Sequence, residues 1–190
     1  QRATLRSLLT HTAGWTGDFF ADTGQGEDAS RRYVEQMADL EQLAPLGEVY
    51  SYNNAGFYLA GRIVEVVTGN AFETVARELV LEPIGMERAY MAPLDVMTHR
   101  FASGHTAGDD GPKVARRWDL PRAAWPAGGV ACSIDDLLQY GRFALGDGTT
   151  EDGERILTPR SMALTRTPQI AVRERASCGI AWHIRKVEGV

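Results

Sequence analysis

The sequence has few lysines and no long apolar run. Only Lys113 and Lys186 occur among 190 residues, so arginine supplies nearly all of the positive charge. With a net charge of −5 and no long basic run, the chain lacks the electrostatic footprint of a protein that binds nucleic acid or an anionic membrane. It also lacks any apolar stretch of about 18 residues, so we expect no membrane-spanning helix in this chain.

Cysteine and histidine are scarce and widely spaced. Cys132 and Cys178 do not show the close spacing of a zinc site or a redox pair, and we expect two free buried thiols rather than a disulfide. The histidines stand at positions 11, 99, 105 and 183, without paired spacing. The sequence therefore predicts no metal and no cofactor. It leaves the compartment open between periplasmic or secreted and cytoplasmic.

The composition is that of one folded unit. Hydrophobic residues make up 44% of the chain and charged residues 24%, and 190 residues suffice for a core. No internal repeat, low-complexity tract or linker divides the chain. Its first residue is Gln1 rather than methionine, and no apolar signal core follows, which is consistent with a processed chain or a fragment.

Hydrophobic periodicity predicts a mainly helical chain. Capping residues and helix stops indicate helices over residues 5–9, 29–40, 57–67, 72–80, 133–145 and 158–164. We expect two of them to bury the apolar stripes Phe57, Ala60, Ile63, Val64, Val67 and Phe72, Val75, Ala76, Leu79, Val80.

Strand signals are weak by comparison. The best lies at residues 177–187, where apolar and polar side chains alternate. A single strand cannot form a sheet, so the sequence predicts a helical unit followed by the start of another element.

Two tyrosines and two asparagines stand directly before the helix predicted from residue 57. In isolation, such residues at a helix start are usually caps or packing residues. Their neighbours change this interpretation, because residues 4–15 resemble the Leu-Leu-Thr-His-Thr-Ser-Gly signature of the serine beta-lactamase-like family. That family includes class C beta-lactamases, D-Ala-D-Ala carboxypeptidases and family VIII-type esterases. The segment Tyr52-Asn53-Asn54 then resembles the family's Tyr-Ser-Asn element, and further landmarks follow in family order at residues 64–69, 82–86, 127–137 and 177–182.

The resemblance implies an α+β fold, the beta-lactamase/DD-peptidase fold. Residues 1–190 would form a single partial domain, with a helical and loop region at 1–175 and the first strand of the antiparallel sheet at 176–190. It also implies hydrolysis of an ester or amide through an acyl-serine, with a small-molecule or peptide substrate as the partner. Small ester, D-amino-acid peptide and beta-lactam all remain open as substrates, with ester or peptide favoured, and the oligomeric state is equally open.

The site residues follow from the same resemblance. Tyr52 would act as general base and acid, and Asn54 would bind substrate. Asn53 would be the variable middle residue, and a competing register with Tyr50 as the catalytic residue fits less well. His11 is expected to be a structural hydrogen-bonding residue.

The chain departs from the family in its nucleophile and in its third motif. Asp110 and His183, not serine, stand three residues before the two lysines, so no Ser-x-x-Lys motif is present. His105 opens a superficial match to His-x-Gly, but we interpret it as a surface loop residue. The favoured interpretation is that the nucleophile lies outside these residues, which would leave an apolar face exposed and the isolated chain prone to aggregate. The alternative is a catalytically inactive penicillin-binding-like scaffold.

Overall fold

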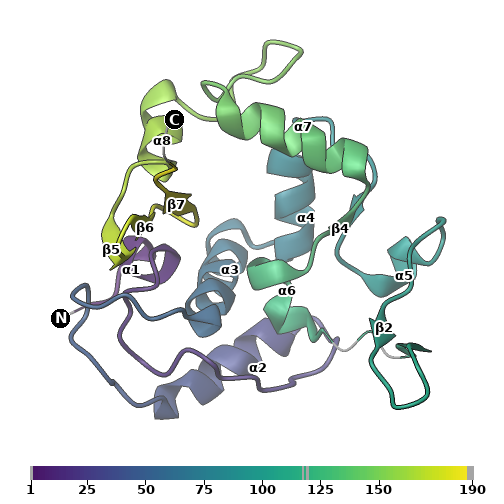
Figure 1. Ribbon diagram of the computed structural model, residues 1–190, viewed down its shortest axis with the longest axis horizontal. Coiled ribbons are helices and arrows are strands. Elements are labelled where there is room, and N and C mark those ends of the chain that lie inside the picture. The colour runs from purple at the N-terminus through teal and green to yellow at the C-terminus, as the bar shows by residue number, and fades with distance from the viewer. Residues whose placement is uncertain (1, 117, 119, 188–190) are drawn as a thin grey trace.

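The structure is a computed structural model that describes residues 2–116, 118 and 120–187. Figure 1 shows α3 near the centre, with α2, α4 and α6 beside it and β5, β6 and β7 together near α1. Within the described ranges, no helix is both long and apolar enough to span a membrane. The helical segments are α1 (Leu5–Leu9), α2 (Ala29–Gln36), η1 (Met37–Asp39), α3 (Asn54–Thr68), α4 (Phe72–Ala76), η2 (Arg77–Leu81), α5 (Pro93–Val96), η3 (Arg122–Ala124), α6 (Trp125–Gly128), α7 (Ile134–Leu145) and α8 (Pro159–Thr165).

The strands are short and pair antiparallel. They form two ribbons, β1–β4 and β2–β3, and one three-stranded sheet in the order β5-β6-β7. Their bounds are β1 (Ala89–Tyr90), β2 (His105–Thr106), β3 (Lys113–Val114), β4 (Ala131–Cys132), β5 (Ile170–Arg173), β6 (Ala176–Cys178) and β7 (His183–Arg185).

The strand expected at 176–190 is in fact two strands, and β5 already precedes them. The chain turns between β6 and β7, where Gly179 donates its backbone N–H to the Trp182 carbonyl at 2.7 Å. Ala181 takes a left-handed backbone with φ of 61°. Such a residue interrupts an extended strand, so the alternating pattern could not run on as one strand. Residues 188–190 lie outside the described residues.

The predicted helix ends are confirmed where the signal is local. The Thr4 hydroxyl accepts the Ser7 N–H at the start of α1, and Ser133 and Asp136 form the same reciprocal capping box before α7. Gly69 closes α3 with a left-handed φ of 72°. These contacts satisfy backbone groups that no helical hydrogen bond can reach.

Helix α3 buries a different face from the one predicted. Ala55, Tyr58 and Gly61 are buried, whereas Phe57 is half-buried and Val67 is 79% exposed. Both stripes are apolar and both repeat with helical spacing, so periodicity could not choose between them. The buried face packs on α2 and α6.

The helix after α3 also buries residues other than those predicted. Its second half, η2, is a π-helical turn in which the Glu82 N–H reaches the Arg77 carbonyl, 3.0 Å away. A π turn holds more residues than an α turn and therefore rotates the side chains that follow. Leu81 is buried as a result, and the predicted core residue Leu79 is 60% exposed.

Two apolar clusters make up the core. One lies between α2, α3 and η3 and comprises Tyr33, Ala55, Tyr58, Ala123 and Ala124. The other joins η2, β1 and α6 and comprises Leu81, Ile84, Met86, Ala89, Met91 and Trp125.

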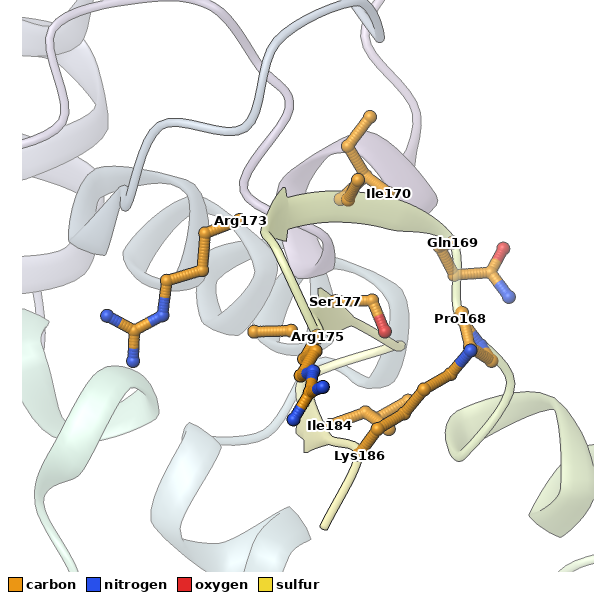
Figure 2. A pocket seen from close by; sticks show the side chains of 10 residues that line it. Pro168, Gln169, Ile170, Arg173, Arg175, Ser177, Ile184 and Lys186 are labelled. Atoms are coloured by element: carbon orange, nitrogen blue, oxygen red, sulfur yellow. The ribbon is translucent and has the colours of Figure 1, made fainter. Parts of the chain in front are cut away.

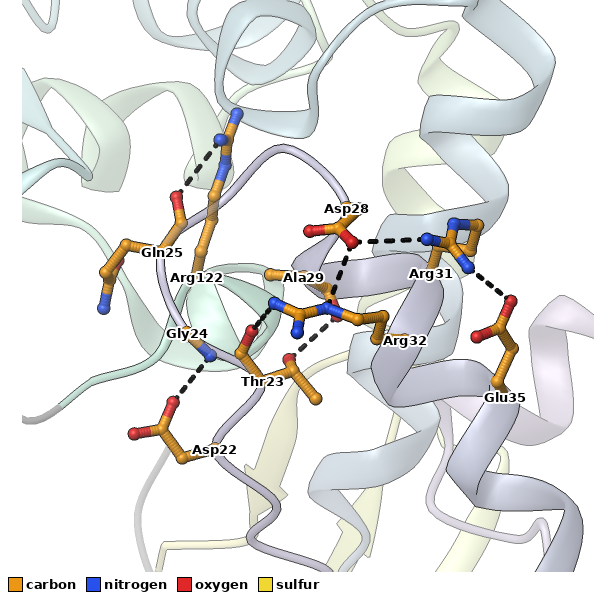
Figure 3. A network of polar contacts seen from close by, with 10 residues as sticks. All are labelled: Asp22, Thr23, Gly24, Gln25, Asp28, Ala29, Arg31, Arg32, Glu35 and Arg122. Atoms are coloured by element: carbon orange, nitrogen blue, oxygen red, sulfur yellow. Dashed lines mark hydrogen bonds and ion pairs between the residues drawn. The ribbon is translucent and has the colours of Figure 1, made fainter.

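Arg122 connects the elements around these clusters. Its guanidinium forms an ion pair with Glu73 of α4 and lies over the Trp125 ring, 5.6 Å from the centroid. It also donates to the Gln25 carbonyl at 3.4 Å, in the loop that precedes α2 (Figure 3). Figure 3 also shows Asp28 at the start of α2 between the guanidinium groups of two arginines of that helix.

The cysteines are both free, as predicted, but only Cys178 is buried. Cys132 in β4 is exposed, which corrects the expectation of two buried thiols. The short β1–β4 ribbon pairs Cys132 with Ala89 and leaves its side chain at the surface.

Apolar side chains remain exposed on several elements, as the sequence led us to expect. One face of the three-stranded sheet is hollowed by a cavity of about 440 Å³, lined by Ile170, Ile184 and the basic Arg173, Arg175 and Lys186 (Figure 2). Large apolar side chains that are at least half exposed in α3, η2 and α7 are Val66, Val67, Leu79, Ile134, Leu137, Leu138 and Leu145.

We expect the 190-residue chain alone to bind a hydrophobic dye in its folded state and to associate increasingly with concentration, because this apolar surface is in contact with water. Dye fluorescence and light scattering across a dilution series measure both effects. A monodisperse monomer with a cooperative melt and no dye binding would contradict the expectation.

A pair of matched glycine substitutions tests the packing of α3. A Cβ added at Gly61 would stand 2.1 Å from Cγ of Pro126 in α6, whereas one added at Gly141 in α7 meets nothing within 4 Å. We expect Gly61→Ala to lower the free energy of unfolding by about 1–3 kcal/mol through overpacking. Gly141→Ala should raise it by about 0.5–1 kcal/mol, since it removes backbone freedom from the unfolded chain. Urea unfolding of the dilute chain measures both, and equal effects would argue against the close contact of α3 and α6.

Candidate active site

The site predicted from the sequence lies where the chain enters α3. Tyr52 is 52% exposed and stands two residues before the first residue of the helix, Asn54. Asn54 is partly exposed, and its side chain forms no hydrogen bond within the described part of the chain. The two predicted site residues are thus near each other in the chain, and both keep solvent contact.

Asn53, between them, is a buried structural residue. It caps α3: its side-chain oxygen accepts the Gly56 N–H at 2.8 Å. The same oxygen accepts the Trp15 indole N–H at 3.3 Å, and its amide nitrogen donates to the Trp15 carbonyl at 3.2 Å. Only 1% of Asn53 is exposed. The sequence had indicated a variable middle position, whereas the structure gives this residue a full set of contacts.

His11 contacts both Asn53 and its neighbour Tyr52. Its Nδ1 accepts the Asn53 backbone N–H at 3.0 Å, which requires an unprotonated Nδ1 and so places the ring proton of the neutral form on Nε2. This contact agrees with the expected hydrogen-bonding role. The imidazole stacks on the Tyr52 ring, with centroids 4.5 Å apart, and lies 5.0 Å from the Phe57 ring. Burial lowers the pKa of His11, and the nearby His183 lowers it further.

His183 joins the site from the far end of the chain. Its ring lies nearly parallel to that of Tyr52, 6.3 Å between centroids, and 6.1 Å from that of His11. The turn before β7 is held against α1, because Ala181 donates its N–H to the Leu9 carbonyl at 2.8 Å. Spacing along the sequence could not reveal this pair, since 172 positions separate the two histidines. The only available signal was the place of His183 beside the Trp182 landmark.

Tyr50, the tyrosine of the competing register, is less exposed than Tyr52. Burial raises the pKa of Tyr50, and Cys178 and Tyr52 nearby raise it further. A raised pKa disfavours the phenolate form that a general base requires.

The other sequence candidates lie elsewhere. His105 is exposed, as expected, but it belongs to the β2–β3 ribbon, opposite Val114, rather than to a loop. Lys113 is in β3 and Lys186 follows β7. Within residues 2–116, 118 and 120–187, no three His, Cys, Asp or Glu side chains gather in a group that could hold a metal ion.

Comparison with known proteins identifies the family. A family model described as Beta-lactamase matches residues 1–190. The chain is 39% identical over 166 residues to penicillin-binding protein 4 of Amycolatopsis lactamdurans, covering 86% of this chain and 43% of that protein. It is 31% identical over 120 residues to the D-aminopeptidase of Gluconobacter oxydans, covering 62% and 22% respectively. The solved penicillin binding protein from Bacillus halodurans superposes with a TM-score of 0.76 at 22% identity, covering 96% of this chain and 56% of that one.

The chain therefore belongs to the beta-lactamase family. Its architecture is the α+β fold of beta-lactamases and penicillin-binding proteins. It spans less than half the length of the two curated relatives named above.

A pH-dependent stability follows from the burial of His11. Because folding lowers the pKa of His11, the unfolded chain binds a proton at higher pH than the folded chain does. The stability that His11 contributes is complete above about 6.5, the ordinary histidine value, and is lost as the pH falls from there to the lower pKa of the folded state.

His11→Asn should remove this part of the pH dependence, since asparagine tolerates the left-handed backbone at this position (φ of 57°) but does not titrate. His105→Asn, at an exposed position, is the matched control and should leave the difference between mildly alkaline and mildly acidic pH as in the parent chain. Urea unfolding of the dilute chain at both pH values measures it. An unchanged pH dependence in His11→Asn would contradict the assignment.

Proposed function

We propose that this chain is part of a serine hydrolase that cleaves an ester or amide through an acyl-serine intermediate. Tyr52 acts as general base and acid, Asn54 binds the substrate, and the serine nucleophile lies outside these 190 residues. The observation that carries the proposal is the exposed phenol of Tyr52, presented at the start of α3 by a buried frame of Asn53 and His11.

The chemistry needs such a group. A serine hydroxyl is a poor nucleophile until a neighbouring base takes its proton. A free phenol titrates near 10, so a phenolic base needs a nearby cation, which the family supplies as the lysine of Ser-x-x-Lys. Stacking on His11 fixes the plane of the Tyr52 ring, and a base that is already oriented loses less entropy when the substrate arrives.

Asn54 is suited to substrate binding because its amide can both donate and accept hydrogen bonds. Its place in the first turn of α3 orients its backbone, and its side chain has no partner within the described residues. Asn53 cannot take this role without giving up the cap and both contacts to Trp15.

The substrate is a small molecule or a peptide. The similarity to a penicillin-binding protein and to a D-aminopeptidase favours an amide or ester next to a D-amino acid, ahead of a beta-lactam hydrolysed as an antibiotic.

Tyr52→Phe in the complete protein tests the proton role. We expect turnover to fall about 100-fold or more, the scale of removing a general base, with little change in the fold because the ring and its stacking remain. Tyr50→Phe is the matched control and should stay within a few-fold of the parent protein. Steady-state hydrolysis of a chromogenic ester and of a D-alanyl peptide measures both, and parent-like turnover in Tyr52→Phe would remove Tyr52 from the mechanism.

Because Ser-x-x-Lys is absent from this chain, a second candidate function is a catalytically inactive scaffold of the same fold. A fluorescent probe that acylates active serines separates the two when applied to the complete protein. Labelling of a serine supports the hydrolase, and a folded protein that takes no label supports the scaffold.

A further inference from the structure

A second cavity, besides the one on the three-stranded sheet, lies next to the β1–β4 ribbon and is not lined by Tyr52. It has a volume of about 530 Å³, within the range of sites for small ligands. The ribbon forms one wall, and the segment after α5 forms another. None of the residues that line it belongs to the candidate active site. The lining residues used below are Arg88, Tyr90, His99, Arg100, Phe101, Trp118 and Cys132.

The cavity is basic. Arg88, His99 and Arg100 line it, and no carboxylate does so among the described residues. Neither guanidinium forms an ion pair with any described residue. Asp136 is buried, accepts the backbone N–H of Arg88 at 3.2 Å and is held by Ser133 of the capping box. The charge of Arg88 helps to lower the pKa of Asp136, but the two side chains form no close ion pair. Two guanidinium groups that line one cavity, neither in a close ion pair with a described carboxylate, attract an anion.

The cavity also has an aromatic wall. The ring of His99 stacks on that of Tyr90, with centroids 4.9 Å apart and planes 21° from parallel. Phe101 is 46% exposed and Trp118 is 40% exposed, so both rings are available to a flat partner. Binding of an apolar group over these rings is favourable, because it removes aromatic surface from water.

We propose that this cavity binds a small aromatic carboxylate. The carboxylate pairs with Arg88 and Arg100, since a guanidinium matches a carboxylate through two parallel hydrogen bonds. The ring of the ligand lies against Phe101 and Trp118. The site needs neither Tyr52 nor an acyl-serine, so its test is independent of the proposed hydrolase function.

Cys132 supplies an internal reporter of occupancy. Its thiol is exposed and lines the cavity, whereas Cys178 is 1% exposed. A ligand in the cavity should slow alkylation of Cys132. Mass spectrometry of the peptide that contains Cys132 reads the rate directly, in the chain or in the complete protein.

The experiment compares 2-naphthoate with 2-naphthalenemethanol, which has the same rings and no charge. We expect naphthoate to protect Cys132 from iodoacetamide at concentrations about tenfold lower than the alcohol, on the scale of a charge-assisted hydrogen bond. Added salt should weaken protection by naphthoate and leave that by the alcohol unchanged.

Two variants locate the charge. Arg88→Gln and Arg100→Gln should each raise the protecting concentration of naphthoate about tenfold, while the backbone N–H of residue 88 still reaches Asp136. Arg160→Gln, at an exposed arginine of α8 outside the cavity, is the matched control and should change nothing. Circular dichroism verifies the fold of each variant, and the salt series on the parent protein replaces any variant that fails to fold.

Three outcomes would overturn the proposal. They are equal protection by the acid and the alcohol, parent-like protection in both cavity variants, and no protection at about 10 mM naphthoate, where even the weakest specific complex would form.

Discussion

The buried amide of Asn53 is the contact on which the candidate site depends. It caps α3 and binds the indole N–H and the backbone carbonyl of Trp15, while the backbone N–H of the same residue donates to His11. Two segments that are distant in sequence, one with His11 and Trp15 and the other at the start of α3, therefore meet at one residue. Asn53 and His11 are both buried, and a buried polar group left without a partner costs about 1–3 kcal/mol. The position of Tyr52 follows from this network because its neighbour in the chain cannot move.

Structural features that depend on only a few neighbouring residues could be predicted from the sequence. The caps at Thr4 and Ser133 and the stop at Gly69 depend on side chains and backbone conformations inside one helical turn, and the structure has them where expected. The family landmarks likewise led to Tyr52 at the entrance of α3. Local patterns are readable because local geometry satisfies them without reference to the rest of the chain.

Features decided by tertiary packing could not be predicted. The choice between the two apolar faces of α3 was made by α2 and α6, and the π turn η2 moved Leu81 inward in place of Leu79. The approach of His183 to Tyr52 depends on the turn at Ala181. The left-handed backbone of this residue could not be predicted, because alanine rarely adopts that conformation. The structural role of Asn53, the middle residue of Tyr-x-Asn, could not be predicted for a related reason. Its partners Trp15 and His11 lie 38 and 42 positions away in the sequence.

The left-handed backbone at position 11 restricts which residue types fit there. A φ of 57° is open to glycine, asparagine, aspartate and histidine at modest cost and is closed to β-branched residues. Of these four, only histidine offers both an aromatic plane to Tyr52 and an acceptor nitrogen at the distance of the Asn53 N–H. Replacing the imidazole by any of the other three residues would remove at least the ring contact to Tyr52, so the plane of the exposed phenol depends on a residue that need not touch a substrate itself.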